Sequence, residues 1–177
     1  FLINTLPDSC RYAKEAALEM GLDAHILTSF LEGESRDVGS VFASLAREIQ
    51  TYGNPFRAPC VLLASGEATT KILDNNAITG HGGPSQEMTL SFAAAAVKTK
   101  GACLLSIDTE GTDGTTACAG GITDSDSMAD MERGGADVYA ALRGHSSWEA
   151  LSAGGCAVVT GNTGTNLCDL NILYVPA

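Results

Sequence analysis

The stretch PSQEMTLSFAAAAVKTKGACLLSI, residues 84–107, decides the fold class. Its first part, from Pro84 to Lys98, is rich in helix formers, and Pro84 suits the first turn because its φ is already helical. After Gly101, residues 102–107 form a short apolar run that is typical of a buried strand. A helix followed directly by a buried strand predicts an α/β unit.

The same alternation extends outward in both directions from this stretch. Short apolar runs predict strands at residues 1–4, 25–27, 60–64, 157–159 and 170–175. Helical spacing or helix-forming composition predicts helices at residues 7–20, 38–52, 136–142 and 148–152. We therefore expect one α/β domain over residues 1–177, with a mixed, mostly parallel sheet that is flanked by helices.

Three further segments are predicted from their turn residues. Residues 65–67 predict a turn, and residues 69–72 a β-branched return strand. The Gly-, Thr- and Asp-rich residues 108–130 predict a long surface loop. The Gly-, Thr- and Asn-rich residues between the last two strands predict the loop of a hairpin.

Composition limits the classes of protein that fit. The chain has 177 residues, 45% hydrophobic and 18% charged, with a formal net charge of −11. That composition indicates a globular domain, and the acidic balance argues against nucleic acid as a partner. No apolar run reaches the length of a membrane-spanning helix, so no membrane partner is expected.

The first residues, Phe1-Leu2-Ile3-Asn4, lack the basic start of a signal peptide and are typical of a strand, which suggests a fragment of a longer chain.

The six cysteines do not form a recognisable framework. None lies in a C-x-x-C pair, and Cys60 and Cys103 sit inside apolar runs. Zinc and disulfide interpretations therefore lack the required spacing, and buried free thiols are expected. Free thiols favour a cytoplasmic location.

Glycines precede the helix that begins at Pro84. In Gly82-Gly83-Pro84-Ser85-Gln86-Glu87, the free N–H groups of the helix start could bind a phosphate or carboxylate, with Ser85 and Gln86 adding side-chain donors. An ordinary glycine-rich approach to a helix is the alternative. The segment is not a Walker A loop, because no Gly-Lys-Ser/Thr follows.

An acidic loop follows the strand at residues 102–107. Open α/β sheets bind ligands beyond the carboxyl ends of their strands, so Asp108 or Asp113 could hold Mg²⁺ through oxygen ligands. Neighbouring Thr112 and Gly114 could hold a substrate. A solvated loop with Asx turns is the alternative.

Two more segments offer hydroxyl, amide or carboxylate groups. Residues 160–166 combine small residues, which allow the backbone to approach a ligand, with hydroxyl and amide groups that can donate hydrogen bonds. A hairpin loop with polar side chains explains these residues equally well. Ser65-Gly66-Glu67 places a carboxylate in a turn that could face the same cleft. The acidic residues of 31–37 precede a helix and are expected to cap it. No spacing identifies a nucleophile and its base, so the catalytic residues stay unknown.

Five of these segments, in this order, resemble the MOFRL domain of glycerate 2-kinase-like proteins, some of which are labelled hydroxypyruvate reductases. They are residues 31–36 (LEGESR, similar to L-E-G-E-A-R), 65–70 (SGEATT, similar to G-G-E-T-T-V), 82–87 (GGPSQE, similar to G-G-R-N-Q-E), 112–120 (similar to T-D-G-x-D-G-P-T-D-A-A-G) and 160–166 with Asp169-Leu170 (similar to T-G-P-T-G-T-N-V-N-D-L).

The resemblance implies a two-lobed phosphotransferase that moves the γ-phosphoryl group of ATP to the 2-hydroxyl of D-glycerate with Mg²⁺. It places a hydroxy-acid substrate and a nucleotide in a cleft between this lobe and an N-terminal lobe that the sequence lacks. The residues implied to bind them are Gly66, Glu67, Gly82, Gly83, Ser85, Gln86, Glu87, Thr112, Asp113, Gly114, Thr163, Gly164, Thr165 and Asn166.

This sequence differs from the family motifs at several positions. Pro84 replaces the family's Arg, Thr115-Thr116 replaces its second Asp, and Asn162 replaces a Pro. The resemblance also implies a catalytic Lys in the N-terminal lobe, which has no counterpart in this sequence, so we expect the 177 residues to be inactive alone. A stand-alone binding module of the same fold and a structural or homo-oligomerisation domain remain as alternatives. A dehydrogenase lacks support, because no strand-linked G-x-G-x-x-G is present.

Overall fold

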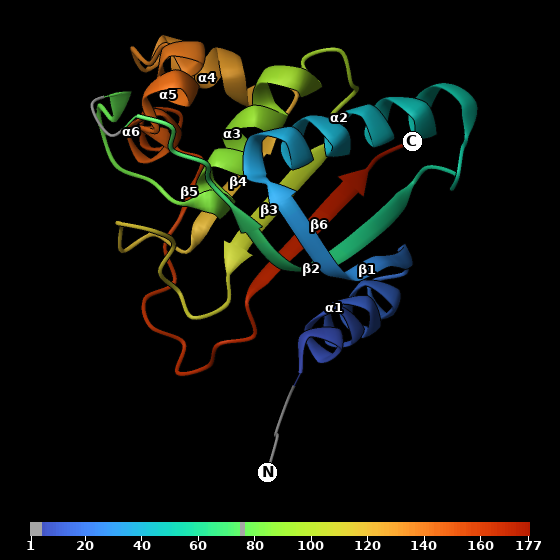
Figure 1. Ribbon diagram of the computed structural model, residues 1–177. Coiled ribbons are helices and arrows are strands. Elements are labelled where there is room, and N and C mark those ends of the chain that lie inside the picture. The colour runs from blue at the N-terminus through green and yellow to red at the C-terminus, as the bar shows by residue number, and fades with distance from the viewer. Residues whose placement is uncertain (1–4, 75–76) are drawn as a thin grey trace.

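A computed structural model of the protein describes residues 5–74 and 77–177. The strand expected at residues 1–4 lies outside the described residues. One six-stranded sheet runs through the molecule in the order β1-β2-β6-β3-β4-β5 (Figure 1). The strands are β1 (Asp23–Glu34), β2 (Cys60–Thr69), β3 (Cys103–Asp108), β4 (Gly120–Asp124), β5 (Ala157–Val158) and β6 (Asp169–Val175).

Helices cover the two faces of the sheet unequally. They are α1 (Leu6–Glu19), α2 (Ser35–Tyr52), α3 (Pro84–Ala96), α4 (Ser127–Arg133), α5 (Val138–Gly144) and α6 (Ser147–Ala153). Figure 1 shows α2 to α6 on one side of the sheet and α1 alone on the other, beside β1 and β2. None of the helices in the described residues is long and apolar enough to cross a membrane.

The predicted α/β class with a mixed sheet is confirmed, but the predicted predominance of parallel pairs is wrong. Among the described strands only β1 and β2 pair in parallel, and the other four pairings are antiparallel. Two of these pairings involve β6, which inserts between β2 and β3 against the direction of both, and the other two join β3, β4 and β5. Local apolar patterns do not encode such an insertion, because strand order depends on contacts distant in sequence.

The main core lies between the sheet and helices α2 and α3. Phe42, Leu62, Phe92 and Leu104 are buried there together with Leu173. The helical spacing expected for residues 38–52 is confirmed, because Phe42, Ala46 and Ile49 all face this core. α2 begins earlier, at Ser35.

Gly39 of α2 lies against α3. A Cβ atom built on Gly39 would stand 2.2 Å from the carbonyl oxygen of Met88. The two helices therefore approach each other closely at a point where only hydrogen fits on the Cα atom.

The turn predicted at residues 65–67 is wrong, and so is the return strand at 69–72. β2 continues without a break from Cys60 to Thr69 and stays paired with β1 along its length. A Cβ on Gly66 would meet the carbonyl oxygen of Leu31 at 2.2 Å. The glycine thus permits a close approach of two backbones within a strand rather than a turn.

Two loops were also predicted incorrectly. The segment 108–130 holds a loop only to residue 119, because β4 and α4 follow. The last two strands do not form a hairpin, since β5 pairs with β4 while β6 occupies the middle of the sheet. The loop between them therefore crosses from one edge of the sheet to its centre.

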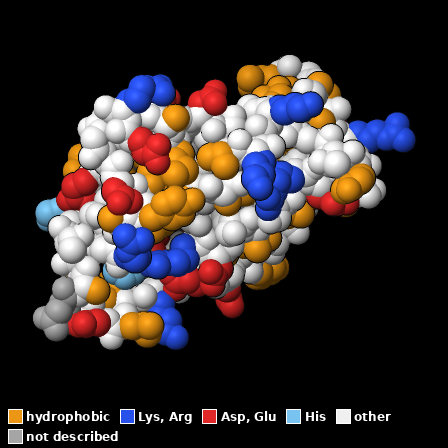
Figure 2. Space-filling view, turned by 90° about the horizontal axis from the view of Figure 1, so that it is seen from above, with side chains coloured by type: hydrophobic (Ala, Val, Ile, Leu, Met, Phe, Trp, Pro, Cys, Tyr) orange, Lys and Arg blue, Asp and Glu red, His pale blue; other side chains and the backbone are white. Residues whose placement is uncertain are grey.

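All six cysteines are free thiols, as expected. Cys10, Cys60, Cys118 and Cys156 are buried, and Cys103 and Cys168 are partly buried. On the helical side, acidic, basic and apolar side chains are interspersed (Figure 2).

Candidate active site

Strand ends converge at one edge of the sheet. Since β2 and β3 both run against β6, their carboxyl ends meet the beginning of β6. Gly66 of β2 and Asp108 of β3 therefore lie on either side of Asp169, the first residue of β6. The amino end of α3 lies over the same edge, because Ser85 and Gln86 bond the loop that follows β3. Segments spread along the sequence from Gly66 to Asp169 thus form one site.

Three adjoining cavities open at this edge, and Glu67 lines all three. The acidic cavity, about 230 Å³, is lined by Glu67, Ala68, Pro84, Asp108, Asp113, Asn166, Cys168 and Asp169. The glycine cavity, about 400 Å³, includes Thr69, Thr70, Gly80, Gly82, Gly83, Pro84, Glu87, Gly114, Thr115 and His145. The edge cavity, about 600 Å³, is formed by residues 30–33, Gly66, Glu67, Thr69 and Cys168.

Most of the residues expected at the site lie together here. Gly66, Glu67, Gly82, Gly83, Glu87, Gly114, Asp108, Asp113 and Asn166 line one or more of the three cavities. Ser85 and Gln86 are fully buried behind them. Thr112, Thr163, Gly164 and Thr165 line none of the three.

Asp113 occupies the amino end of α3. One carboxylate oxygen, Oδ1, accepts the Ser85 backbone N–H at 3.3 Å, and Oδ2 accepts the Gln86 backbone N–H at 2.9 Å. The Gln86 side chain also donates to Oδ2 at 3.0 Å. The donors that the glycine motif was expected to offer a ligand are thus used by the protein's own carboxylate. That reason for anion binding is wrong, and Asp113 caps a helix.

Burial dominates the ionisation of Asp113. It raises the pKa of this carboxyl to about 6, although the N–H groups of Gln86 and Ser85 oppose the shift. Gly83 makes the close fit possible, since a Cβ there would stand 2.3 Å from the Asp113 Cγ atom. The glycine is therefore required for contact within the protein.

A second buried carboxyl, Asp169, faces the acidic cavity. Its Oδ2 atom accepts the Ala68 backbone N–H at 3.3 Å, and burial raises its pKa to about 7. Burial also raises the pKa of the neighbouring Asp108. Asp169 belongs to the last segment that resembles the family, but it was not among the residues expected to bind a ligand. The available signal was the pair Asp169 and Asn171, polar residues on the buried face of an otherwise apolar strand.

Within residues 5–74 and 77–177, no three His, Cys, Asp or Glu side chains gather as a metal-binding group. Asp108 and Asp113 both line the acidic cavity, but Asp113 already accepts three N–H bonds. The Asp108 carboxylate accepts only the Glu110 backbone N–H among its described partners, at 2.9 Å. Asp108 is thus the better placed of the two expected metal ligands.

Glu87 lies at the floor of the glycine cavity and is 2% exposed. Its carboxylate forms an ion pair with Arg36, and its Oε2 atom lies 3.0 Å from His145 Nδ1. Arg36 also reaches Glu34, with 3.5 Å between Nε and Oε1. Glu34, directly before α2, thus joins an ion-pair network and makes no side-chain bond that caps the helix. No spacing in the sequence linked Glu87 to His145.

Hydrogen bonds connect the loop after β5 to the loop after β3. Thr163 donates its hydroxyl to the Thr109 carbonyl oxygen at 2.5 Å, and Asn166 donates its amide to Glu110 Oε2 at 3.0 Å. The two glycine- and threonine-rich segments are therefore one structural unit. Thr163, Gly164 and Thr165 remain exposed at its tip.

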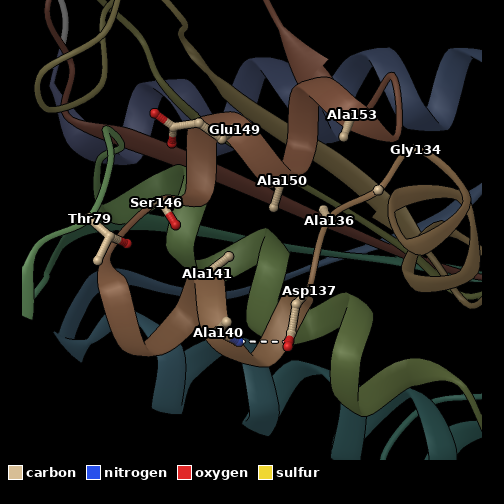
Figure 3. A pocket seen from close by; sticks show the side chains of 11 residues that line it. Thr79, Gly134, Ala136, Asp137, Ala140, Ala141, Ser146, Glu149, Ala150 and Ala153 are labelled. Carbon is tan, nitrogen blue, oxygen red and sulfur yellow. Dashed lines mark hydrogen bonds between the residues drawn. The ribbon is translucent and has the colours of Figure 1, made fainter.

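A separate cavity of about 320 Å³ lies among α4, α5 and α6 (Figure 3). Small residues such as Ala136, Ala140 and Ala150 line it, and Asp137 at its rim caps α5 by accepting the Ala140 N–H at 2.8 Å. None of the residues expected to bind a ligand lines it. The strand-end edge, and not this cavity, is therefore the candidate site.

Comparisons with known proteins agree with the expected family. A model of the MOFRL family matches residues 60–169. The chain is 39% identical over 175 residues to the glycerate 2-kinase of Pyrococcus horikoshii, covering 99% of this chain and 39% of that protein. It is 37% identical to the D-glycerate 2-kinase of Thermotoga maritima, covering 97% of this chain and 40% of the relative.

The fold is also similar to that of a solved glycerate kinase structure. The crystal structure of a glycerate kinase from Thermotoga maritima superposes with a TM-score of 0.93 at 36% identity, over 99% of this chain and 41% of that one. The chain thus spans about 40% of the length of the curated relatives it matches.

Proposed function

The chain belongs to the MOFRL family, and on that premise we propose that residues 1–177 are the C-terminal lobe of a glycerate 2-kinase-like enzyme. The complete enzyme transfers the γ-phosphoryl group of ATP to the 2-hydroxyl of D-glycerate. The names of the relatives support this reaction. Their greater length supports a further lobe, to the N-terminal side, that completes the site.

One observation carries the proposal: the three cavities meet at the carboxyl ends of β2 and β3. In open α/β sheets this is the edge at which ligands bind. Most residues that line the cavities belong to the segments in which the sequence resembles the family. Glu67 stands where all three cavities meet, so a ligand in any of them lies close to its carboxylate.

The donor groups of the glycine cavity suit a phosphate chain. Thr69, Thr70 and Thr115 carry hydroxyls, and Gly80 and Gly114 leave their backbones accessible. Phosphoryl transfer depends mainly on positioning and on neutralisation of charge, with little covalent chemistry by the protein. In our proposal these residues bind and orient the phosphates.

The acidic cavity fits a magnesium ion that arrives with the nucleotide. Mg²⁺ usually takes one or two protein carboxylates together with phosphate oxygens and water, and not an all-protein cage. Asp108 and Glu67 are the carboxylates that would hold it, because Asp113 is used as a cap. When bound, the ion supplies neutralising charge to the phosphates.

The site lacks the positive charge that this reaction needs. None of the described side chains that line the three cavities is a lysine or an arginine. At the position of the family's Arg, Pro84 lies between the acidic and glycine cavities and lines both. Basic groups must therefore come from the proposed second lobe, and we expect the 177 residues alone not to turn over.

The first test is calorimetric titration of the chain with Mg·ADP and, separately, with D-glycerate. We expect saturable heat with Mg·ADP that Glu67→Gln weakens and that Glu132→Gln, an exposed change on α4, leaves unchanged. Gly83 is unsuitable for this test, because any side chain there would displace Asp113. The polypeptide encoded by the whole gene is then assayed for ATP-dependent phosphorylation of D-glycerate.

Pro84 favours a second candidate, a binding module without catalysis. It leaves the junction of the acidic and glycine cavities with no lysine or arginine side chain. Saturable binding by the chain, together with no phosphorylation by the whole-gene polypeptide, would support that module. Absence of both binding and turnover would contradict both functions and leave a structural domain.

A further inference from the structure

The outward side of β3 and β4 is apolar where a solvent-facing sheet would be polar. Leu105 pairs with Ile172 on one side and with Ile122 on the other, and Ile107 pairs with Leu170. These residues point away from the main core, because their neighbours Leu104 and Leu173 face it. We call Leu105, Ile107, Ile122 and Val158 the outer sheet face.

The described helices leave this surface uncovered. α1, the helix on this side, packs chiefly on β1 and β2 (Figure 1). Leu170, Ile172 and Tyr174 of β6 join the cluster under α1, but the residues of the outer sheet face belong to none of the three core clusters. Ile122 is 45% exposed.

A sheet with apolar residues on both faces is normally covered on both. β3 and β6 have this pattern, since inward Leu104 and Leu173 alternate with outward Leu105 and Ile172. An antiparallel sheet with one side in water would instead alternate apolar with polar residues. A contiguous apolar surface of this kind marks a contact with another protein element.

We propose that the outer sheet face is the docking surface for a segment of the same polypeptide outside residues 1–177, which continues the layer begun by α1. The proposal rests on the proposed function only in assuming a longer chain. In the Thermotoga maritima glycerate kinase, which this chain matches with a TM-score of 0.93, 41% of the protein corresponds to these residues. More than half of such a protein therefore lies outside them.

A second copy of the chain fits this surface less well. Each copy carries a formal charge of −11, so two copies face to face repel each other. A covalently continuous segment also pays less entropy on docking, because its effective concentration at the surface is high. The segment we expect is a helix with an apolar stripe, since helices pack on the other described faces of this sheet.

Hydroxyl-radical footprinting with mass spectrometry tests this surface in the unmodified protein. We expect Ile122 and Leu105 to be oxidised in the 177-residue chain and protected in the whole-gene polypeptide. There their oxidation should fall to the level of Leu173, which is fully buried. Val97, 50% exposed at the end of α3, serves as the control and should react equally in both.

Three outcomes would overturn the proposal. One is equal oxidation of Ile122 in both proteins, and another is a gene that encodes only these 177 residues. The third is protection in the 177-residue chain that appears with its dimerisation in sedimentation, since a second copy would then be the occupant. Protection in a whole-gene polypeptide that lacks kinase activity would support the docking surface and contradict the proposed reaction, so the two failures are distinguishable.

Discussion

Asp113 shows how one side chain can stabilise both a helix and a loop. We expect Asp113→Ala to lower the free energy of unfolding by about 1–2 kcal/mol, because the Ser85 and Gln86 N–H groups lose their acceptor. Urea denaturation measures the change. Asp126→Ala is the matched control, since Asp126 precedes α4 without a side-chain cap bond. Equal losses in the two variants would contradict the assignment.

Asp169 makes stability depend on pH. Because burial raises its pKa from 3.8 to about 7, the folded chain holds this proton more tightly than the unfolded chain does. Its contribution is therefore full below about pH 4 and is lost as the pH rises through about 7. We expect Asp169→Asn to be less sensitive to pH across this window, and about 1–3 kcal/mol more stable relative to wild type at pH 8 than at pH 4. Thermal melts of both proteins measure this difference, and parallel pH profiles would contradict it.

At the residue level, the sequence grouped segments that do line adjoining cavities, but it did not predict the contacts between them. The segments around Gly66, Gly82 and Asp113 were expected at a common cleft, and they do line adjoining cavities. The bond from Asp113 to α3 could not be expected, because local sequence does not show that a loop 27 residues later returns to cap the helix. The contact between Glu87 and His145 is hidden for the same reason.

Gly39 allows helices α2 and α3 to approach each other closely. In an exposed helix, Gly→Ala adds about 1 kcal/mol of stability. We expect Gly39→Ala to reverse this sign and cost about 1–3 kcal/mol, because the new methyl group would meet the Met88 carbonyl oxygen. Chemical denaturation measures the cost, and Ser40→Ala, on the exposed side of the same helix, is the control. A stabilised Gly39→Ala chain would disprove the close contact.

Helices were predicted better than strands. The 3.6-residue period and Pro84 located α2 and α3 within a few residues. Gly66 and the pair Gly120-Gly121 suggested turns or loops, yet they lie inside β2 and β4. The same glycine can permit a turn or the close approach of a neighbouring backbone, and only the neighbour distinguishes the two.

The whole molecule depends on β6, which joins the β1-β2 pair to the β3-β4-β5 group. Because the core continues across this junction, we expect a single cooperative unfolding transition. Fluorescence of Trp148, the chain's one tryptophan, reports on α6, while far-UV circular dichroism reports on all elements. The two denaturation curves should coincide, and separated midpoints would show that the two parts unfold independently.

The α/β class followed from composition and periodicity, but the arrangement of strands did not. Predicting mostly parallel pairs assumed that each strand follows its neighbour in sequence. β6 breaks this rule, because it pairs with β2, which is about 100 residues earlier, and with β3. Long-range pairing of this kind is decided by the global packing of side chains.

The central place of β6 also matters while the protein is being made. Translation adds about 5–20 residues per second, so β2 and β3 emerge from the ribosome several seconds before Asp169–Val175 exists. During that interval both strands present unpaired edges in the nascent chain, where they can pair with neighbouring polypeptides on the same messenger RNA. A chaperone that shields these edges until β6 is translated would therefore raise the yield of folded protein more than one that acts after release.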